Sequence, residues 1–423
     1  MGTVRLFLGT AVKRNWEVHQ MDVYNAFLHG DLEEEIYMKH PPGFKASDPK
    51  KVCRLRKSIY GLKQSPRCWF EKLSTALKKF GFEQSLSDYS LFTMDKDGEQ
   101  LHVLVYVDDL IITGSTMTVM QAFKDYLSTC FHMKDLGPLK YFLGIEVAHS
   151  PSGMYLCQRK YALDIISDSG LLGAKPVAFP LESNNKLALS ASPYLPHPAK
   201  YRRLIGRLIY LAVTRPDLAY CVHFLAQFMQ KPREDHWEAA LRVVKYLKNN
   251  PGQGILLRAA GSFQFTGWCD SDYSGCPLTR RSVTGYFIQL GGSPISWKTN
   301  KQKTVSRSSA EAEYRAMAHI TQELIWLKRI LLSLGVKHDG SMLVRCDSEA
   351  AIHIATNPVF HERTKHVEVD CHFVRNEVLT KNIRLLHVGT GSQLADILTK
   401  PLGTQDYAQF CVKLGIQDLH APT

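Results

Sequence analysis

Two adjacent acids, Asp108 and Asp109, stand between two short apolar runs in the segment HVLVYVDDLIITG at residues 102–114. Runs of β-branched and aliphatic residues of this length form strands, and Asp is a common turn former. The segment therefore predicts a tight β-hairpin that carries both carboxylates at its tip. Taken alone, two acids at a turn are structural more often than functional, so their meaning depends on what surrounds them.

A third acid precedes this hairpin. Asp22 ends a short apolar stretch in QMDVYNAFLHGDL, and the aromatic Phe27 follows five positions later. Nucleotidyl transfer needs carboxylates from separate segments, because they hold two Mg²⁺ ions that activate the primer 3′ hydroxyl and neutralise the triphosphate. Asp22 and the pair at 108 and 109 form a candidate set for this chemistry.

The chain divides near residues 179–200, a segment with four prolines and many small polar residues that predicts a loop or linker. Before it, residues 1 to about 170 alternate short strand-like runs with helical pieces, such as RCWFEKLSTALKKF at 67–80, and so predict an α+β domain. After it, residues 201–250 predict three helices separated by prolines. From residue 264 a hairpin about Gly291 and Gly292, a long helix and two strand-helix units predict an α/β domain.

Glu313 is the most unusual acid of the second half. Counting from it along the expected helix gives an apolar stripe, whereas Glu311 faces elsewhere and forms a capping-box pattern with Ser308. A carboxylate on a buried face is unfavourable unless it is paired or bound to metal. Glu313 is thus a candidate ligand, and the alternative is a side chain at the edge of the stripe that reaches solvent.

Three further acids lie at the ends of expected strands or starts of expected helices. Asp270 follows the strand FQFTGWC, Asp347 ends the strand MLVRC, and Asp396 lies in the first turn of a helix that begins near Ser392. Asp347 has the alternative of a helix cap, and Asp396 that of a favourable charge at a helix N-terminus. If they converge with Glu313, the four can bind a metal pair for phosphodiester cleavage.

The strings QMDVYNAFLHGDLEEEIYM, SIYGLKQSPRCWFEKL and YVDD resemble the polymerase motifs of copia-type reverse transcriptases, in the usual order. The resemblance implies that Asp22, Asp108 and Asp109 are the metal carboxylates of a polymerase palm. It implies that Phe27 excludes a ribose 2′ hydroxyl and that Gln64 lines the incoming nucleotide and template. Lys63 and Arg67 are candidate phosphate contacts. The alternatives are an ordinary core aromatic for Phe27 and a solvated loop face for the two cations.

The strings GWCDSDYSG, SWKTNKQKTVSRSSAEAEY, CDSEAAI and QLADILTKPL resemble the ribonuclease H domain of the same elements. Its metal carboxylates match Asp270, Glu313, Asp347 and Asp396. Asp272 and Asp370 are weaker candidates. The histidines 361, 366 and 372 near Cys371 lack a four-ligand zinc spacing and are interpreted as surface or core residues. A basic stretch before the Glu313 helix either follows hybrid backbone or is a solvated loop; it comprises Lys298, Lys301, Lys303 and Arg307.

The resemblance implies an α+β and α/β protein in three ranges. Residues 1–178 are a reverse transcriptase palm with partial fingers, because only about twenty residues precede Asp22; residues 179–258 are a linker and helical thumb or connection; residues 259–415 are a ribonuclease H-like mixed sheet with helices. The implied cofactor is Mg²⁺, two per active site, with Mn²⁺ as an alternative. The implied partners are RNA template, DNA primer, RNA–DNA hybrid, deoxynucleoside triphosphates and the rest of a Pol polyprotein, on a route to DNA integration.

Charge and cysteines agree with this reading without deciding it. The formal net charge is +12, from 52 basic and 40 acidic residues, and the ten cysteines show no paired CxxC spacing. A polyanion partner, reduced thiols in a cytoplasmic location and an absence of membrane spans are therefore expected. A virus-like particle within the cytoplasm is what the resemblance implies. Two alternatives stay open: only the hybrid nuclease works, or the chain is a non-catalytic nucleic-acid-binding remnant.

Overall fold

The computed structural model describes residues 1–44, 48, 50–357 and 368–418. They form two compact units: a larger one of Met1–Lys13, Lys140–Leu332 and Val336–Thr423, and a smaller one of Arg14–Leu139 with Ser333–Gly335. The range 1–178 expected from the sequence thus includes parts of both units, and the assignment of functional domains to residue ranges stays a prediction. Among the described residues, no helix has both the length and the apolar character needed to cross a bilayer.

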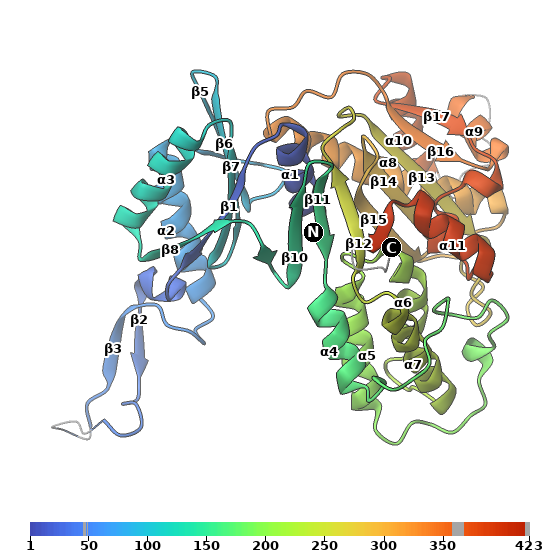
Figure 1. The fold of residues 1–423 in the computed structure, drawn as a ribbon, viewed down its shortest axis with the longest axis horizontal. Coiled ribbons are helices and arrows are strands. Elements are labelled where there is room, and N and C mark those ends of the chain that lie inside the picture. The colour runs from blue at the N-terminus through green and yellow to red at the C-terminus, as the bar shows by residue number, and fades with distance from the viewer. Residues whose placement is uncertain (45–47, 49, 358–367, 419–423) are drawn as a thin grey trace. The chain divides into compact units, whose positions relative to one another are not determined.

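The smaller unit is built on a six-stranded sheet with the strand order β4-β5-β6-β7-β1-β8. Helices α2 and α3 pack together on this sheet, and the β2–β3 ribbon extends away from it (Figure 1). The apolar faces of sheet and helices enclose a core that includes Trp69, Leu73, Phe92 and Phe123. Its elements are β1 (Val18–Val23), η1 (Ala26–His29), β2 (Asp31–Met38), β3 (Cys53–Lys57), α2 (Ser65–Phe80), β4 (Glu83–Gln84), β5 (Leu91–Lys96), β6 (Glu99–Tyr106), β7 (Asp109–Gly114), α3 (Met117–Cys130) and β8 (Met133–Pro138).

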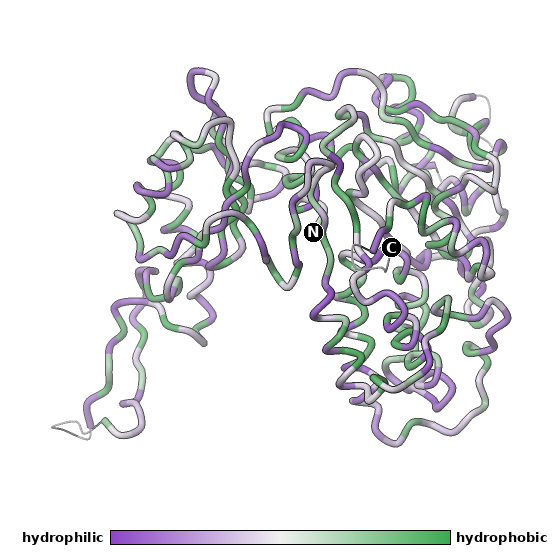
Figure 2. The backbone as a smooth tube through the Cα atoms, in the orientation of Figure 1, coloured by the Kyte–Doolittle hydropathy of each residue, from purple (hydrophilic) through white to green (hydrophobic). Residues whose placement is uncertain are grey.

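Two sequence predictions for this unit are confirmed. The expected helix at 67–80 is α2, which ends where Gly81 takes a φ of 121° that other residues adopt only with strain. The expected hairpin is β6–β7, whose buried strands appear hydrophobic in Figure 2, in contrast to the hydrophilic turn between β5 and β6.

The larger unit contains two five-stranded sheets and a group of helices. One sheet has the order β18-β12-β11-β10-β9 and the other β15-β14-β13-β16-β17. Helix α1 (Gly2–Lys13), which the sequence analysis did not predict, lies against β11, β12 and β15 and is buried over most of its length. The strands of the first sheet are β9 (Tyr141–Phe142), β10 (Ile145–Ser150), β11 (Gly153–Cys157), β12 (Gln253–Arg258) and β18 (Ile416–Asp418).

Helices α4 to α7 form one core together with α11 (Figure 1). The three helices expected from residues 201–250 are present as α5, α6 and α7, but α5 begins at Pro198, within the loop predicted for residues 179–200. The rest of that segment is irregular apart from η2. These elements are α4 (Arg159–Asp168), η2 (Leu187–Leu189), α5 (Pro198–Leu211), η3 (Pro216–Leu218), α6 (Ala219–Ala226), α7 (Glu234–Asn249) and α11 (Thr404–Lys413).

The second sheet carries the expected hairpin, strands β14 and β15, whose turn residues Gly291 and Gly292 have φ of 53° and 81°. Strand β13 is antiparallel to β14 but parallel to β16, and β16 is parallel to β17. The remaining elements are β13 (Phe265–Asp272), β14 (Val283–Leu290), β15 (Ser293–Lys301), α8 (Ser309–Ser333), β16 (Met342–Cys346), α9 (Glu349–Thr356), α10 (Glu368–Leu379), β17 (Ile383–His387), η6 (Thr390–Ser392) and η7 (Asp396–Leu398).

Candidate active sites

In the smaller unit the three predicted polymerase acids meet at one end of the sheet. Asp22 on β1 is paired with Asp109 on β7 in antiparallel register, and the backbone N–H of Val23 donates to the carbonyl of Asp108 at 2.9 Å. Carboxylates from two separate segments are thus adjacent, as nucleotidyl transfer requires.

The turn that carries Asp108 has an unusual backbone. Val107 and Asp108 form a two-residue turn between the paired residues Tyr106 and Asp109, and Val107 has a φ of 57°. A β-branched residue is strained in this left-handed region. The indole N–H of buried Trp69 donates to the Val107 carbonyl at 2.6 Å, so helix α2 holds the turn in place.

The acids of this site oppose one another's ionisation. Burial raises the pKa of Asp22, and the nearby Asp108 raises it further. Burial also raises the pKa of Asp109, although its Oδ1 accepts a 2.9 Å hydrogen bond from the amide of Gln20. A bound cation would relieve this repulsion, so the donor set fits a hard divalent ion.

Phe27 lies in η1, half-buried, with its ring centroid 4.7 Å from that of Tyr60. Burial and the charges of Asp108 and Asp22 raise the pKa of Tyr60, which places this tyrosine beside the acids. Tyr60 was not among the residues predicted from the sequence, although it lies within the motif SIYGLKQSPR. Phe27 therefore has an aromatic neighbour at the acidic end of the sheet, as a side chain that contacts a nucleotide would need.

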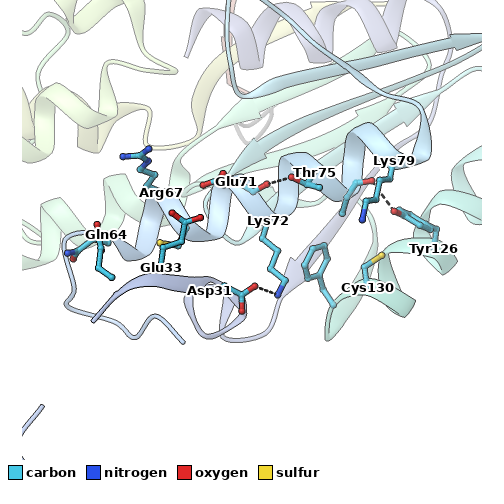
Figure 3. A pocket seen from close by; sticks show the side chains of 14 residues that line it. Asp31, Glu33, Gln64, Arg67, Glu71, Lys72, Thr75, Lys79, Tyr126 and Cys130 are labelled. Atoms are coloured by element: carbon cyan, nitrogen blue, oxygen red, sulfur yellow. Dashed lines mark hydrogen bonds and ion pairs between the residues drawn. The ribbon is translucent and has the colours of Figure 1, made fainter. Parts of the chain in front are cut away.

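Gln64 and Arg67 line a pocket of about 530 Å³ on the smaller unit, whereas Lys63 is exposed and does not line it (Figure 3). The pocket also carries several acids, of which Asp31 binds Lys72 at 2.7 Å. Neither Asp22 nor Phe27 lines it. The pocket thus joins Gln64 and Arg67 to a mixed set of acidic and basic side chains, and the acids of the hairpin tip do not line it.

In the larger unit Asp270 and Asp347 come from neighbouring parallel strands. Asp270 lies near the end of β13 and Asp347 follows the end of β16, so both reach the same edge of the sheet. Close packing of α8 and η7 against the sheet brings their acids to the same edge. The packing needs glycine at two positions: a Cβ on Gly267 would lie 2.5 Å from Ile320 of α8, and a Cβ on Gly285 would lie 2.7 Å from Thr399 beside η7.

Glu313 points from α8 to this edge. Its side chain is 7% exposed, and its Oε1 accepts a 3.0 Å hydrogen bond from the backbone N–H of Ser271. The alternative of a solvent-directed side chain is therefore wrong. Glu311, by contrast, accepts from the backbone N–H of Arg307 at 2.8 Å and pairs with Arg315, so it caps the helix as predicted.

Asp396 begins the short helix η7 rather than lying in a helix that starts near Ser392, where the structure has a separate 3₁₀ turn, η6. It is 3% exposed; Oδ2 lies 3.0 Å from Nζ of Lys400, while Oδ1 is buried without a hydrogen-bond partner among the described residues. Asp270 accepts a hydrogen bond from the hydroxyl of Thr399. Lys400 and Thr399 were missed, although Lys400 follows Asp396 at the helical spacing of four.

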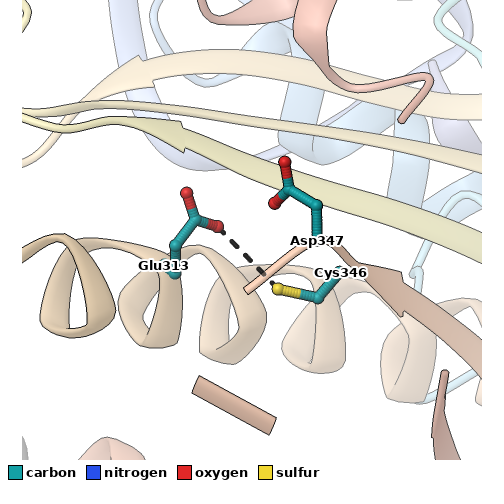
Figure 4. A group of neighbouring side chains, drawn as sticks. All are labelled: Glu313, Cys346 and Asp347. Carbon is teal, nitrogen blue, oxygen red and sulfur yellow. Dashed lines mark hydrogen bonds between the residues drawn. The ribbon is translucent and has the colours of Figure 1, made fainter. Parts of the chain in front are cut away.

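Ligand atoms of Asp270, Asp347 and Asp396 lie within 4.8 Å of one another, and so do those of Glu313, Cys346 and Asp347 (Figure 4). Asp22, Asp108 and Asp109 form no such group in the described part of the chain. Burial and then Asp270 raise the pKa of Glu313 to about 10 and that of Asp396 to about 7. A buried oxygen without a partner, among acids that resist ionisation, fits a divalent cation held by oxygen ligands.

The weaker candidates are not brought into these groups. Burial and Asp270 raise the pKa of Asp272, and Asp370 lies on α10. His372 is exposed beside Glu368, and the histidines 361 and 366 lie outside the described residues. In the basic stretch, Lys301 donates to the thiol of Cys276 at 3.1 Å. All ten cysteines are free, as predicted.

The profile of a family described as reverse transcriptase (RNA-dependent DNA polymerase) matches residues 1–183. The retrovirus-related Pol polyprotein from transposon RE2 of Arabidopsis thaliana is 45% identical over 98% of this chain, which covers 28% of that polyprotein. The putative transposon Ty5-1 protein of Saccharomyces cerevisiae is 32% identical over 72% of this chain and 100% of its own length. The chain belongs to the copia-type retrotransposon Pol family.

Two more comparisons bear on this Pol chain. The Pol polyprotein from transposon TNT 1-94 of Nicotiana tabacum is 37% identical over 95% of the chain, which covers 31% of that protein. The structure of a foamy viral protease-reverse transcriptase in complex with RNA/DNA hybrid aligns with a TM-score of 0.52 and 12% identity, over 92% of this Pol chain and 45% of that one. The predicted fold, a reverse transcriptase followed by a ribonuclease H-like domain, is confirmed. The Pol chain spans less than a third of the transposon polyproteins it matches.

Proposed function

We propose that the chain is an RNA-directed DNA polymerase with ribonuclease H activity, which copies retrotransposon RNA into DNA and cleaves the RNA of the resulting hybrid. The observation that carries this proposal is the convergence of Asp270, Glu313, Asp347 and Asp396, from four separate elements, on one sheet edge in two overlapping groups of ligand atoms within 4.8 Å. Membership of the Pol family supports both activities.

For the nuclease, the four acids would hold two Mg²⁺ ions, with Mn²⁺ as an alternative. Such a pair activates a water and stabilises the leaving oxygen in phosphodiester cleavage. The chain's own contribution is to keep these carboxylates in place: the backbone of Ser271 orients Glu313, and Thr399 and Lys400 orient Asp270 and Asp396.

For the polymerase, Asp22, Asp108 and Asp109 would hold the metal ions, and Phe27 would exclude the ribose 2′ hydroxyl. The substrates would be deoxynucleoside triphosphates on an RNA template with a DNA primer. The complexes of the foamy viral relatives with RNA/DNA hybrid and with double-stranded DNA support partners of this class. Gln64, and with it Lys63 and Arg67, would contact nucleotide or phosphate.

A narrower function, in which only the hybrid nuclease works, is favoured by one observation. Among the described residues, the nuclease acids form compact ligand groups, whereas Asp22, Asp108 and Asp109 do not. A non-catalytic nucleic-acid-binding remnant is the third outcome that the experiment separates.

The test is primer extension on an RNA template with Mg²⁺ and deoxynucleotides, run in parallel with cleavage of an RNA–DNA hybrid. The Asp108→Asn, Asp109→Asn double variant should lose extension and keep cleavage, and Asp347→Asn should lose cleavage and keep extension. No extension by the unaltered chain, with cleavage that Asp347→Asn abolishes, leaves the nuclease alone. No activity in either assay contradicts the proposal and leaves the remnant.

The cellular setting is part of the same proposal. A Pol chain of this family would act with the rest of its polyprotein, in a virus-like particle in the cytoplasm, before DNA integration. Fractionation of cells that express the element, with detection of this chain and of element RNA in the same particle, tests it.

A further inference from the structure

A thiol lies inside the nuclease site. Cys346 directly precedes Asp347, is fully buried, and points toward Glu313, with its Sγ 3.9 Å from the Oε2 of that side chain (Figure 4). Sulfur is a poor ligand for Mg²⁺, which prefers hard oxygen donors. Neither the proposed cleavage nor the proposed polymerisation uses this thiol.

A second thiol adjoins the first. Cys269 directly precedes Asp270 on β13, the strand parallel to β16, and is also fully buried. A hydrogen bond to Cys346 and burial raise the pKa of the Cys269 thiol. The two strands that bring acids to the sheet edge therefore also bring sulfur.

We propose that Glu313, Cys346 and Asp347 form a site for a thiophilic divalent cation such as Zn²⁺ or Cd²⁺. Their ligand atoms all lie within 4.8 Å of one another. A tetrahedral zinc ion with its usual bond lengths holds sulfur and oxygen ligands about 3.5 Å apart. The 3.9 Å between Cys346 and Glu313 needs a shift of only a few tenths of an ångström to match it.

An independent observation favours cation binding at this edge of the sheet. Asp396, which shares Asp347 as a neighbour in the adjoining ligand group, keeps a buried Oδ1 without a hydrogen-bond partner among the described residues. Lys400 supplies one ammonium group to this cluster, through the other oxygen of Asp396. An uncompensated buried carboxylate is unfavourable, and a divalent ion is the partner that removes the cost.

Binding at this site is a ligand exchange without a change of oxidation state. The S–H bond of Cys346 and the O–H bond of the Glu313 carboxyl break, metal–sulfur and metal–oxygen bonds form in place of metal–water bonds, and both protons leave to solvent. Because thiolate selects zinc and cadmium over magnesium, the same Glu313 and Asp347 then serve two kinds of ion according to which is available. An occupied thiophilic site removes both carboxylates from the Mg²⁺ pair and should block hybrid cleavage; this consequence rests on the proposed nuclease function.

The experiment is titration of the whole, Mg²⁺-free, reduced chain with Co²⁺, whose thiolate complexes have a charge-transfer band in the near ultraviolet. The band should saturate at one equivalent of Co²⁺ and should be lost in Cys346→Ser. Glu313→Gln should bind Co²⁺ at least about tenfold more weakly than the unaltered chain does. Cys371→Ser, a buried cysteine on α10 that belongs to neither ligand group, is the matched control and should keep the band. A band that survives Cys346→Ser, or no band in the unaltered chain, overturns the proposal.

A second measurement needs no variant, in case Cys346→Ser does not fold. X-ray absorption at the zinc edge, on the unaltered chain with one equivalent of Zn²⁺, should show sulfur together with oxygen in the first shell. A shell without sulfur overturns the proposal. Neither readout depends on cleavage, so a chain that binds zinc through Cys346 but cleaves no hybrid contradicts the proposed function and not this site.

Discussion

The ammonium nitrogen of Lys400 lies 3.0 Å from Oδ2 of Asp396, four residues earlier in the chain. This ion pair favours the charged form of the carboxyl, yet burial and Asp270 still hold the pKa of Asp396 at about 7. Asp396 is thus protonated in the metal-free folded chain at pH values at which the unfolded chain has already ionised it. Folding stability without metal must therefore fall as pH rises from the ordinary carboxyl range through about 7.

Lys400→Met should increase the loss of folding stability that accompanies a rise in pH. Without the ammonium group, the folded-state pKa of Asp396 rises further, so the variant should be no less stable near pH 5, where the carboxyl is protonated in both proteins. Near pH 8.5 it should be less stable by on the order of 1 kcal/mol, since the lysine is part-exposed and screened. Urea denaturation in chelator at both pH values measures this; Lys337→Met, at an exposed lysine, is the control. Equal losses at both pH values would contradict the assignment.

Glu313→Gln should stabilise the metal-free chain at pH 8. Burial raises the pKa of Glu313 to about 10, so the folded state must keep the proton, whereas the unfolded chain releases it near its ordinary value of 4.5. The neutral amide of glutamine does not ionise in either state, so the variant does not lose stability in this way. Its free energy of unfolding should be higher by about 1–3 kcal/mol at pH 8, and by much less near pH 4.5. Thermal melting in chelator tests this. Mg²⁺ should then raise the melting temperature of the variant less than that of the unaltered chain, because one ligand is gone.

Asp217→Asn should destabilise the helical part of the larger unit by about 3–5 kcal/mol, because it leaves buried Arg215 without a counter-charge. Asp217 accepts hydrogen bonds from Arg215 at 2.7 and 3.0 Å and from Tyr246 at 2.8 Å, and both charged side chains are at most 1% exposed. Asp168→Asn is the control. Asp168 forms an ion pair with Arg207 at 2.6 Å, nearly the same distance as in the buried pair, but its side chain is 69% exposed. That variant should change stability by about 0–1 kcal/mol. Similar losses in the two variants would show that burial is not what matters.

Val107→Gly should stabilise the smaller unit. The left-handed backbone of Val107 costs about 1–2 kcal/mol, and the greater freedom of glycine in the unfolded chain returns part of this, so a net gain of about 0.5–1 kcal/mol is expected. Val105→Gly, on the buried strand two residues before, should instead lose on the order of 2–4 kcal/mol. Denaturation followed by tryptophan fluorescence gives both values, and a loss in Val107→Gly would mean that the turn is not strained.

Phe27→Val should weaken discrimination against ribonucleotides if the polymerase works as proposed. The smaller side chain leaves room for a 2′ hydroxyl, and a change of this size in a pocket alters selectivity by about 10–200-fold. The ratio of kcat/KM for deoxynucleotide and ribonucleotide incorporation measures it. Leu28→Val, at the exposed neighbour on the same short helix, should leave the ratio unchanged. An unchanged ratio in Phe27→Val would assign this ring to the core alone.

Local patterns predicted much of the fold because the elements concerned carry their own signals. The apolar period and Gly81 delimit α2, the glycine pair places the β14–β15 turn, and the position of Glu313 on an apolar stripe predicted its burial. Helix α1 had no such signal. It is surrounded by apolar partners, and Arg5 donates to the carbonyl of Ile295, 290 residues away. Only the tertiary fold supplies that acceptor.

In the candidate sites, too, contacts between residues far apart in the sequence could not be predicted. Motifs identified the seven acids, but not Thr399 and Lys400, which orient two of them, or Tyr60, which lies beside Asp22 and Asp108. These three residues were missed because only the folded chain brings them next to the acids. The cysteines form no paired motif in the sequence, and all ten are free, as predicted. It could not show that Cys269 and Cys346 are neighbours, because residues 77 positions apart meet only when β13 and β16 align.

Helix α1 also limits the order in which the parts of the chain can fold during synthesis. It is synthesised before the strands that it covers, since it lies against β11, β12 and β15, the last of which begins at Ser293. The smaller unit, almost all within Arg14–Leu139, can close while α1 still has no surface to cover. Until the ribosome has passed residue 301, this apolar helix must be shielded by something else, so a nascent chain stopped before that point should bind chaperones through residues 2–13.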